Sequence, residues 1–161
     1  MKHSKGIAEE TVKNFLSGYN CAQSVLLTIA KRYKVRSALI PKIATGFGSG
    51  IGRCGSVCGA LTGGVMAIGM RCGTNKPSRR ERERCYELTE KLFARFKDRH
   101  GTILCRDLIG YNLSEAEERR RATDENVFEK KCPDFVRTVI VTLMDLGAAG
   151  NKPVSKQKRR A

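Results

Sequence analysis

The sequence predicts an all-α fold, a compact single-domain helical bundle built around a central glycine-rich helix. Apolar residues recur at three- and four-residue spacings along most of the chain, and the one strand-like stretch, 139–141, has no second strand to pair with. A length of 161 residues suits one domain, and 40% hydrophobic residues are enough to form a core. We therefore expect a folded domain over residues 1–150 and a disordered basic tail over 151–161.

Helices are expected wherever apolar periodicity lies between residues that begin or end helices. Gly18 ends the first helix, Asn20 can cap the second, Gly101 closes the long charged one, and Pro133 suits the first position of the last. Residues 46–52 are a loop with alternating glycines, and 112–131 is a charged loop with a surface helix. The expected helices are 5–16, 21–33, 38–44, 56–72, 78–100, 105–109 and 133–146.

The central helix is predicted from an uncharged segment, 54–70, that lies between Arg53 and Arg71. It is at the short limit for a membrane span and contains five glycines, so we expect a buried helix and no span. Gly55, Gly59 and Gly63 recur every four residues, which leaves one face open to another backbone or to a cofactor. That close approach fits packing within one chain or across the axis of a homodimer.

The chain is strongly basic, with 31 Lys and Arg against 16 Asp and Glu and a net charge of +15. Such a charge attracts acidic partners, but there is no zinc-finger spacing and no aromatic signature of a single-strand binder, so we expect no nucleic-acid binding. The segment 50–55 matches a dinucleotide-binding pattern, yet no strand precedes it and no acidic residue follows before residue 81. His3 and His100 are expected to be solvated.

Seven cysteines are the chemically distinctive feature of the sequence. Residues 1–10 contain no apolar run, so we expect no signal peptide and a reducing cytoplasm, where clustered cysteines indicate metal or redox chemistry. Four of them lie at or beside predicted helix starts, where backbone N–H groups stabilise thiolates. If these starts converge, they form a pocket for an anionic four-sulfur centre. These four residues are Cys21, Cys58, Cys105 and Cys132.

The other three cysteines have separate expected roles. Cys72 and Cys85 lie within predicted helices without special neighbours, so we expect them to be small apolar core residues. Cys54 lies four residues before Cys58 and can share its helix face, which suits a substitute ligand or a resolving thiol.

Residues 58–63 read Cys-Gly-Ala-Leu-Thr-Gly, follow the segment Gly-Tyr-Asn-Cys-Ala-Gln-Ser-Val at 18–25, and precede single cysteines at 105 and 132. Over about residues 8–147 the chain resembles the C_GCAxxG_C_C family of small prokaryotic redox-active proteins, whose signature cysteines fall on Cys21, Cys58, Cys105 and Cys132. A related domain occurs in split-Soret cytochromes, which bind haem and an iron–sulfur cluster. The chain has no C-x-x-C-H motif for covalent haem, and it differs from the family pattern in Cys54, Cys72, Cys85 and its basic tail.

Three functions are consistent with these features. The first is electron transfer through an iron–sulfur cluster (2Fe–2S or 4Fe–4S) or another metal centre held by the four signature cysteines, with an unidentified redox partner protein. Their separations of 37, 47 and 27 residues resemble neither a ferredoxin run nor a zinc ribbon, so only the tertiary fold would assemble the site. The second is metal-free thiol–disulfide chemistry, with Cys58 attacking and Cys54 or Cys21 resolving. The third is a basic adaptor whose tail binds an acidic partner or nucleic acid.

Overall fold

The computed structural model describes residues 2–148, with side chains described from residue 5 onward. Within that range the fold is all-α, as predicted, and the only strand-like pairing is an isolated antiparallel bridge between Val57 and Leu104. No helix of the described part of the chain is long and apolar enough to cross a membrane. The predicted basic tail, 151–161, lies outside the described residues.

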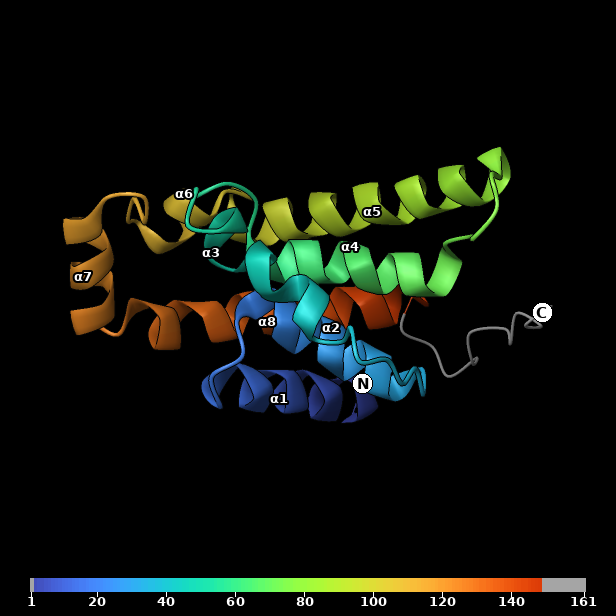
Figure 1. Ribbon diagram of the computed structural model, residues 1–161, viewed down its shortest axis with the longest axis horizontal. Coiled ribbons are helices and arrows are strands. Elements are labelled where there is room, and N and C mark those ends of the chain that lie inside the picture. Colours follow the sequence, from blue (N-terminus) through green and yellow to red (C-terminus); the bar gives the residue numbers. More distant parts are fainter. Residues whose placement is uncertain (1, 149–161) are drawn as a thin grey trace.

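The helices follow one another in the order drawn in Figure 1. They are α1 (Lys2–Leu16), α2 (Cys21–Arg32), the 3₁₀ helix η1 (Lys42–Phe47), the short turn α3 (Gly48–Ile51), α4 (Gly59–Cys72), α5 (Arg79–His100), α6 (Cys105–Ile109), α7 (Ala116–Asp124) and α8 (Val127–Asp145).

Helix α4 is the centre of the bundle, as the sequence predicts. It packs against α2, α5 and α8, while α1 covers α8 and α2 on the other side. Figure 1 shows α5 running along one side of α4, α8 running below α4 and behind α2, and α7 standing across one end of the molecule. The core that these helices share includes Leu61, Phe96 and Ile140, each no more than 1% exposed.

Small residues let α4 approach its neighbours this closely. A Cβ atom added at Gly63 would lie 2.7 Å from the carbonyl oxygen of Ala22 on α2. One added at Gly64 would lie 2.8 Å from Leu92 and 2.9 Å from Val139, on α5 and α8. Gly63 and Gly64 therefore set the distances from α4 to α2, to α5 and to α8.

Several helix boundaries differ from the prediction, and the central helix begins at Gly59 rather than at residue 56. The helix expected at 38–44 is a 3₁₀ helix shifted to Lys42–Phe47. The last helix begins at Val127, six residues before Pro133, and this proline is the seventh residue of α8. The buried Val127 side chain packs these extra turns against the core. Because proline has no backbone N–H, the helix lacks one backbone hydrogen bond at this position.

His100 is not solvated as predicted. Its side chain is only 8% exposed, and its ring lies 4.5 Å from that of Phe96 and 5.0 Å from that of Phe135. Burial lowers the pKa of His100, which favours the neutral ring that hydrogen-bonds to Thr138. His100 therefore joins the end of α5 to the middle of α8 and belongs to no candidate site.

The close contact between α2 and α4 predicts opposite effects for two alanine substitutions in α4. Gly63→Ala should lower the free energy of unfolding by about 1–3 kcal/mol because its Cβ meets the α2 backbone. Gly69→Ala should raise it by about 0.5–1 kcal/mol because nothing lies within 4 Å and alanine favours the helix. Urea denaturation measures both values, and equal effects at the two positions would contradict this packing.

Candidate functional site: a cluster of four cysteines

The structure brings the four signature cysteines together in the core. Cys58, Cys105 and Cys132 are between 3% and 7% exposed and belong to one apolar cluster, against which the half-buried Cys21 packs. Cys21 lies close enough to Cys132 for this neighbour to raise its pKa. Cys58 lies close enough to Cys21 and Cys105 for each to raise its pKa. Residues up to 111 positions apart in the sequence therefore share one site.

Cys21 is held by the start of α2. Asn20 accepts a hydrogen bond from the backbone N–H of Gln23 at 2.9 Å, and the Gln23 side chain accepts one from the Asn20 N–H at 3.1 Å, a capping box. Both side chains also donate to Thr45, on η1, each at 2.9 Å. Asn20 and Gln23 thus hold the start of α2, and Cys21 with it, against η1.

A short antiparallel bridge joins Cys58 to Cys105. The Cys58 N–H donates to the carbonyl of Ile103 at 2.9 Å, and the Cys105 N–H donates to that of Ser56 at 2.7 Å. The Arg106 guanidinium donates to the carbonyls of Gly55 and Cys54, at 3.4 and 3.2 Å. This pairing fixes two of the four cysteines relative to each other before any metal or disulfide bond is considered.

Gly59 makes room for Cys21 beside Cys58. A Cβ atom at Gly59 would lie 3.0 Å from the carbonyl oxygen of Phe47 and 3.2 Å from the Cβ of Cys21. At the signature glycine after Cys58, the start of α2 and the end of η1 therefore both lie against α4.

The alternating glycines form a left-handed turn against Cys105. Residues 49–53 all have positive φ, between 55° and 75°, including Ser49, Ile51 and Arg53. A left-handed conformation costs a non-glycine residue roughly 1–2 kcal/mol. A Cβ at Gly50 would lie 2.6 Å from the Cβ of Cys105. Close packing and positive φ angles therefore explain the glycines that make this segment resemble a nucleotide-binding loop.

The expectation that all four cysteines lie at helix starts is wrong for Cys132. Cys21 and Cys105 are the first residues of α2 and α6, and Cys58 is the cap of α4. Cys132 is instead the sixth residue of α8, because this helix begins at Val127. It reaches the cluster from the side of α8 and contributes no free N–H groups.

The expectation that helix starts lower the pKa values of these thiols is also wrong. The hydrogen bond with Cys132, then burial, raise the pKa of Cys21 well above its usual value. Burial raises the pKa of Cys58 further than the N–H groups of Ala60 and Leu61 lower it, and neither forms a regular capping hydrogen bond. Burial, then Cys21, raises the pKa of Cys105 to about 12. Burial therefore outweighs the helix dipole here.

The positions of the thiols do not form a metal site as they stand. Among residues 2–148, no three Cys, His, Asp or Glu side chains are grouped closely enough to hold a metal ion. Cys54 is exposed and lies outside the cluster that contains the other four. Cys72 is buried and Cys85 is partly buried against the apolar core, as expected for small core residues.

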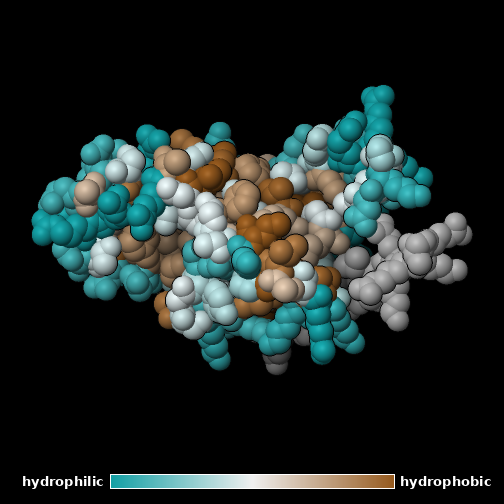
Figure 2. Space-filling view, viewed as in Figure 1, coloured by the Kyte–Doolittle hydropathy of each residue, from teal (hydrophilic) through white to brown (hydrophobic). Residues whose placement is uncertain are grey.

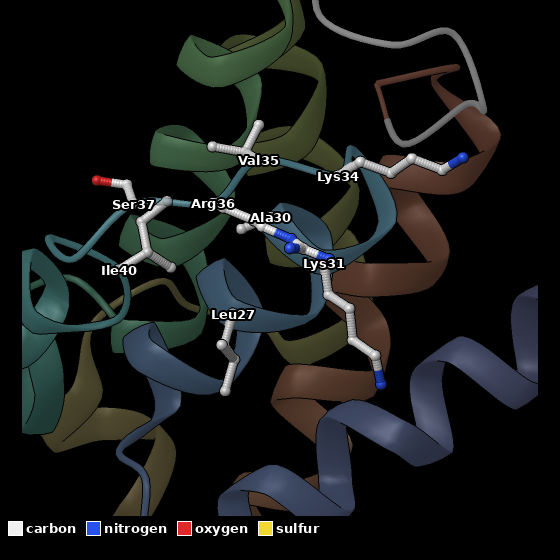
Figure 3. A pocket seen from close by; sticks show the side chains of 8 residues that line it. All are labelled: Leu27, Ala30, Lys31, Lys34, Val35, Arg36, Ser37 and Ile40. Atoms are coloured by element: carbon white, nitrogen blue, oxygen red, sulfur yellow. The ribbon is translucent and has the colours of Figure 1, made fainter.

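No signature cysteine lines the surface hollows beside α2, at the α4–α5 connection, at the α1–α2 turn or along α5. A hollow of about 690 Å³ beside α2 is lined by basic and apolar side chains, among them Leu27, Lys31 and Arg36, and Lys31 is paired with Glu10 (Figure 3). Figure 2 shows apolar side chains gathered on the middle of this face of the molecule. Exposed apolar residues include Leu39, Ile43 and Phe47. The cysteine cluster is therefore a buried centre rather than an open substrate cleft.

The residues that position the site were only partly visible in the sequence. Asn20 was predicted as a cap from its residue type, whereas the bonds of Gln23 to Thr45 and of Arg106 to the loop were not predicted. Gln23 lies three residues after Asn20, which is the spacing of a capping box and was an available signal. Nothing local in the sequence pairs Arg106 with residues 54 and 55.

Because the left-handed turn packs on Cys105, alanine substitutions at Gly50 and at Gly46 should affect stability and alkylation differently. Gly50→Ala should destabilise the protein by about 1–3 kcal/mol and increase the alkylation of Cys105 by iodoacetamide, because the new Cβ meets Cys105. Gly46→Ala is the matched control, since nothing lies within 4 Å of its added Cβ. Denaturation and mass spectrometry of alkylated peptides measure the effects. Similar results for both variants would show that the turn does not pack on Cys105.

Comparison with known proteins agrees with this geometry. A family model described as "Putative redox-active protein (C_GCAxxG_C_C)" matches residues 19–146, which include all four clustered cysteines and the glycine-rich helix. No curated protein and no solved structure matches the chain significantly. The match extends over most of the 161 residues, so the chain belongs to the C_GCAxxG_C_C family of redox-active proteins.

Proposed function

We propose that the protein transfers electrons through an iron–sulfur cluster held by Cys21, Cys58, Cys105 and Cys132. The observation that carries this proposal is the gathering of four thiols from α2, α4, α6 and α8 in one apolar cluster. Four cysteine thiolates are the usual ligand set of 2Fe–2S and 4Fe–4S clusters. When bound, such a cluster would accept and release single electrons.

The four cysteine side chains are chemically suitable ligands for such a cluster. All four groups are soft sulfur ligands, and no carboxylate or histidine is among the causes of the pKa shifts of Cys21, Cys58 and Cys105. Gly59 leaves space beside Cys58, and the N–H groups of Ala60 and Leu61 face its sulfur, where they would stabilise negative charge. Loading requires the Cys21 and Cys132 thiols to turn from each other, since no three ligands are grouped as they stand.

Burial favours this proposal over nucleophilic thiol chemistry. With a pKa of about 12, only about one Cys105 thiol in 10⁵ is ionised at pH 7. A thiol needs its thiolate form to attack a disulfide, whereas a coordinating metal removes the proton itself. The apolar surroundings that suppress free thiolates also exclude water from a bound cluster.

The contact between Cys21 and Cys132 favours a second candidate, a metal-free dithiol. Cys132 is the largest cause of the raised pKa of Cys21, and oxidation of this pair by a partner disulfide would form a Cys21–Cys132 bond with the loss of two electrons and two protons. This pairing differs from the expected attack by Cys58 with Cys54 or Cys21 as resolver. The third candidate, a basic adaptor, depends on the tail at 151–161, outside the described residues.

The iron–sulfur proposal predicts stoichiometric iron and acid-labile sulfide, with charge-transfer bands in the visible spectrum, in protein purified without oxygen. Cys58→Ser should reduce iron and sulfide to background because it removes a central ligand. Cys85→Ser is the control and should leave them unchanged, because Cys85 lies at the far end of α4. Colourless, metal-free wild-type protein after anaerobic reconstitution with iron and sulfide would refute the proposal.

The dithiol candidate predicts a specific disulfide bond in metal-free protein. After oxidation, trypsin should release residues 14–31 joined to residues 132–137, and mild reduction should reverse the link. Cys132→Ser should abolish it while Cys54→Ser, at an exposed position, should not. Peptide mass spectrometry makes the measurement. Links that involve Cys54 instead would exclude the Cys21–Cys132 pair as the redox couple.

A further inference from the structure

A group of exposed apolar side chains lies on the segments that cover the four-cysteine cluster. Its members recur every fourth residue from 39 to 51, with one more at residue 104, and each is between 37% and 59% exposed. The Ile43 N–H donates to the carbonyl of Leu39 at 2.8 Å, so these two residues lie one helical turn apart. The five residues, which we call the apolar face, are Leu39, Ile43, Phe47, Ile51 and Leu104.

The apolar face lies beside two of the clustered cysteines. Leu104 directly precedes Cys105 and pairs in the antiparallel bridge with Val57, which directly precedes Cys58. A Cβ atom built on the glycine before Ile51 would lie 2.6 Å from the Cβ of Cys105. Figure 2 shows apolar side chains at the middle of the face on which Figure 1 places η1 in front. Because both cysteines are buried, this face is the outer surface next to them.

Positive charge surrounds the apolar face. Lys42 directly precedes Ile43, and Arg53 follows Ile51 by two residues. Arg106 lies on α6, and its guanidinium donates to two backbone carbonyls of the loop before α4. These three cations are exposed, and within the described part of the chain none of them forms an ion pair. The surface therefore has an apolar centre and a cationic rim.

The charge of this surface favours an acidic partner over a second copy of the chain. Residues 11–80, which carry all of the apolar face except Leu104, contain eleven Lys and Arg and no Asp or Glu. Asp107 is the acidic residue of α6, and it accepts a hydrogen bond from Thr102 at 3.2 Å. Two copies that met through this surface would bring like charges together, whereas acidic side chains on another protein would complement the rim.

We propose that the apolar face binds an acidic one-electron carrier protein and is the place where electrons enter the four-cysteine site. An apolar centre with a charged rim is the arrangement of protein interfaces, and complexes that transfer electrons use small ones. In the transfer, the bound carrier loses one electron and the iron of the cluster gains it, and no bond forms or breaks. This role in electron transfer rests on the proposed function, whereas binding of the carrier needs no iron.

The rim and the apolar face should affect different rate constants of binding. Rim charges act before the two proteins touch, so they change the association rate and its dependence on salt. Apolar side chains lose their water only in the complex, so they change the dissociation rate. The two groups of residues can therefore be tested separately.

The first measurement follows the association of flavodoxin, an acidic flavin carrier, with the full-length chain by surface plasmon resonance. The double variant Lys42→Glu, Arg53→Glu should associate about tenfold more slowly at low salt, and added salt should reduce this difference. Arg80→Glu with Arg84→Glu is the matched control: it changes the net charge equally, but at exposed positions at the start of α5, whereas Leu104 follows its end. Cytochrome c, which is basic, should not bind.

The second measurement follows dissociation of the same complex. Ile43→Ser should speed dissociation about tenfold, because the complex loses the burial of an apolar side chain that is 55% exposed in the free protein. Tyr86→Ser is the control at equal exposure, 54%, because Tyr86 lies on α5 outside the apolar face. It should leave the dissociation rate unchanged.

Several results would overturn the proposal. They are the absence of flavodoxin binding, equal slowing of association in both charge variants, and equal dissociation rates in the two serine variants. A dimer in analytical ultracentrifugation that Ile43→Ser dissociates would also overturn it, because a second copy would then occupy the face. Repeating the measurements with and without iron separates the two proposals. Iron-loaded protein that binds no flavodoxin would reject the docking surface alone, and binding by a chain that takes up no iron would reject the cluster alone.

Discussion

The close contact between α2 and α4 is the constraint on which the site depends. Gly63 lets the two backbones meet, and Gly59 lets the start of α2 lie against the start of α4. Because Cys21 begins α2 and Cys58 caps α4, this contact alone places the two cysteines side by side. A larger residue at either glycine would push α2 and α4 apart. The sulfurs of Cys21 and Cys58 would then move apart with the helices. The family motif is therefore as much a packing requirement as a chemical one.

Two further devices complete the cluster from more distant parts of the chain. The bridge between residues 56–58 and 103–105 brings in Cys105, and the core face of α8 brings in Cys132. The resulting site is dry and apolar, which raises the pKa values of its thiols. A site of this kind suits a group that binds thiolates directly and tolerates little water. It suits rapid exchange with free disulfides poorly.

Local patterns in the sequence predicted most of the helices, because apolar spacing, Asn20, Ser78 and Gly101 are local signals. They failed at Cys132, where Pro133 indicated a helix start but buried Val127 extends the helix six residues further back. They also failed at the central helix, which was expected from residue 56 but begins at Gly59. Sequence spacing cannot show burial, so it predicted thiolates stabilised by helix dipoles where the structure has protonated thiols.

The central claim is that four particular sulfurs make one metal-binding centre. X-ray absorption at the iron edge tests it most directly, in a variant with Cys54, Cys72 and Cys85 all replaced by serine and reconstituted anaerobically. This account predicts an iron environment of sulfur ligands indistinguishable from that of the wild-type protein. Oxygen or nitrogen ligands in place of sulfur, or the absence of bound iron from this variant alone, would contradict it.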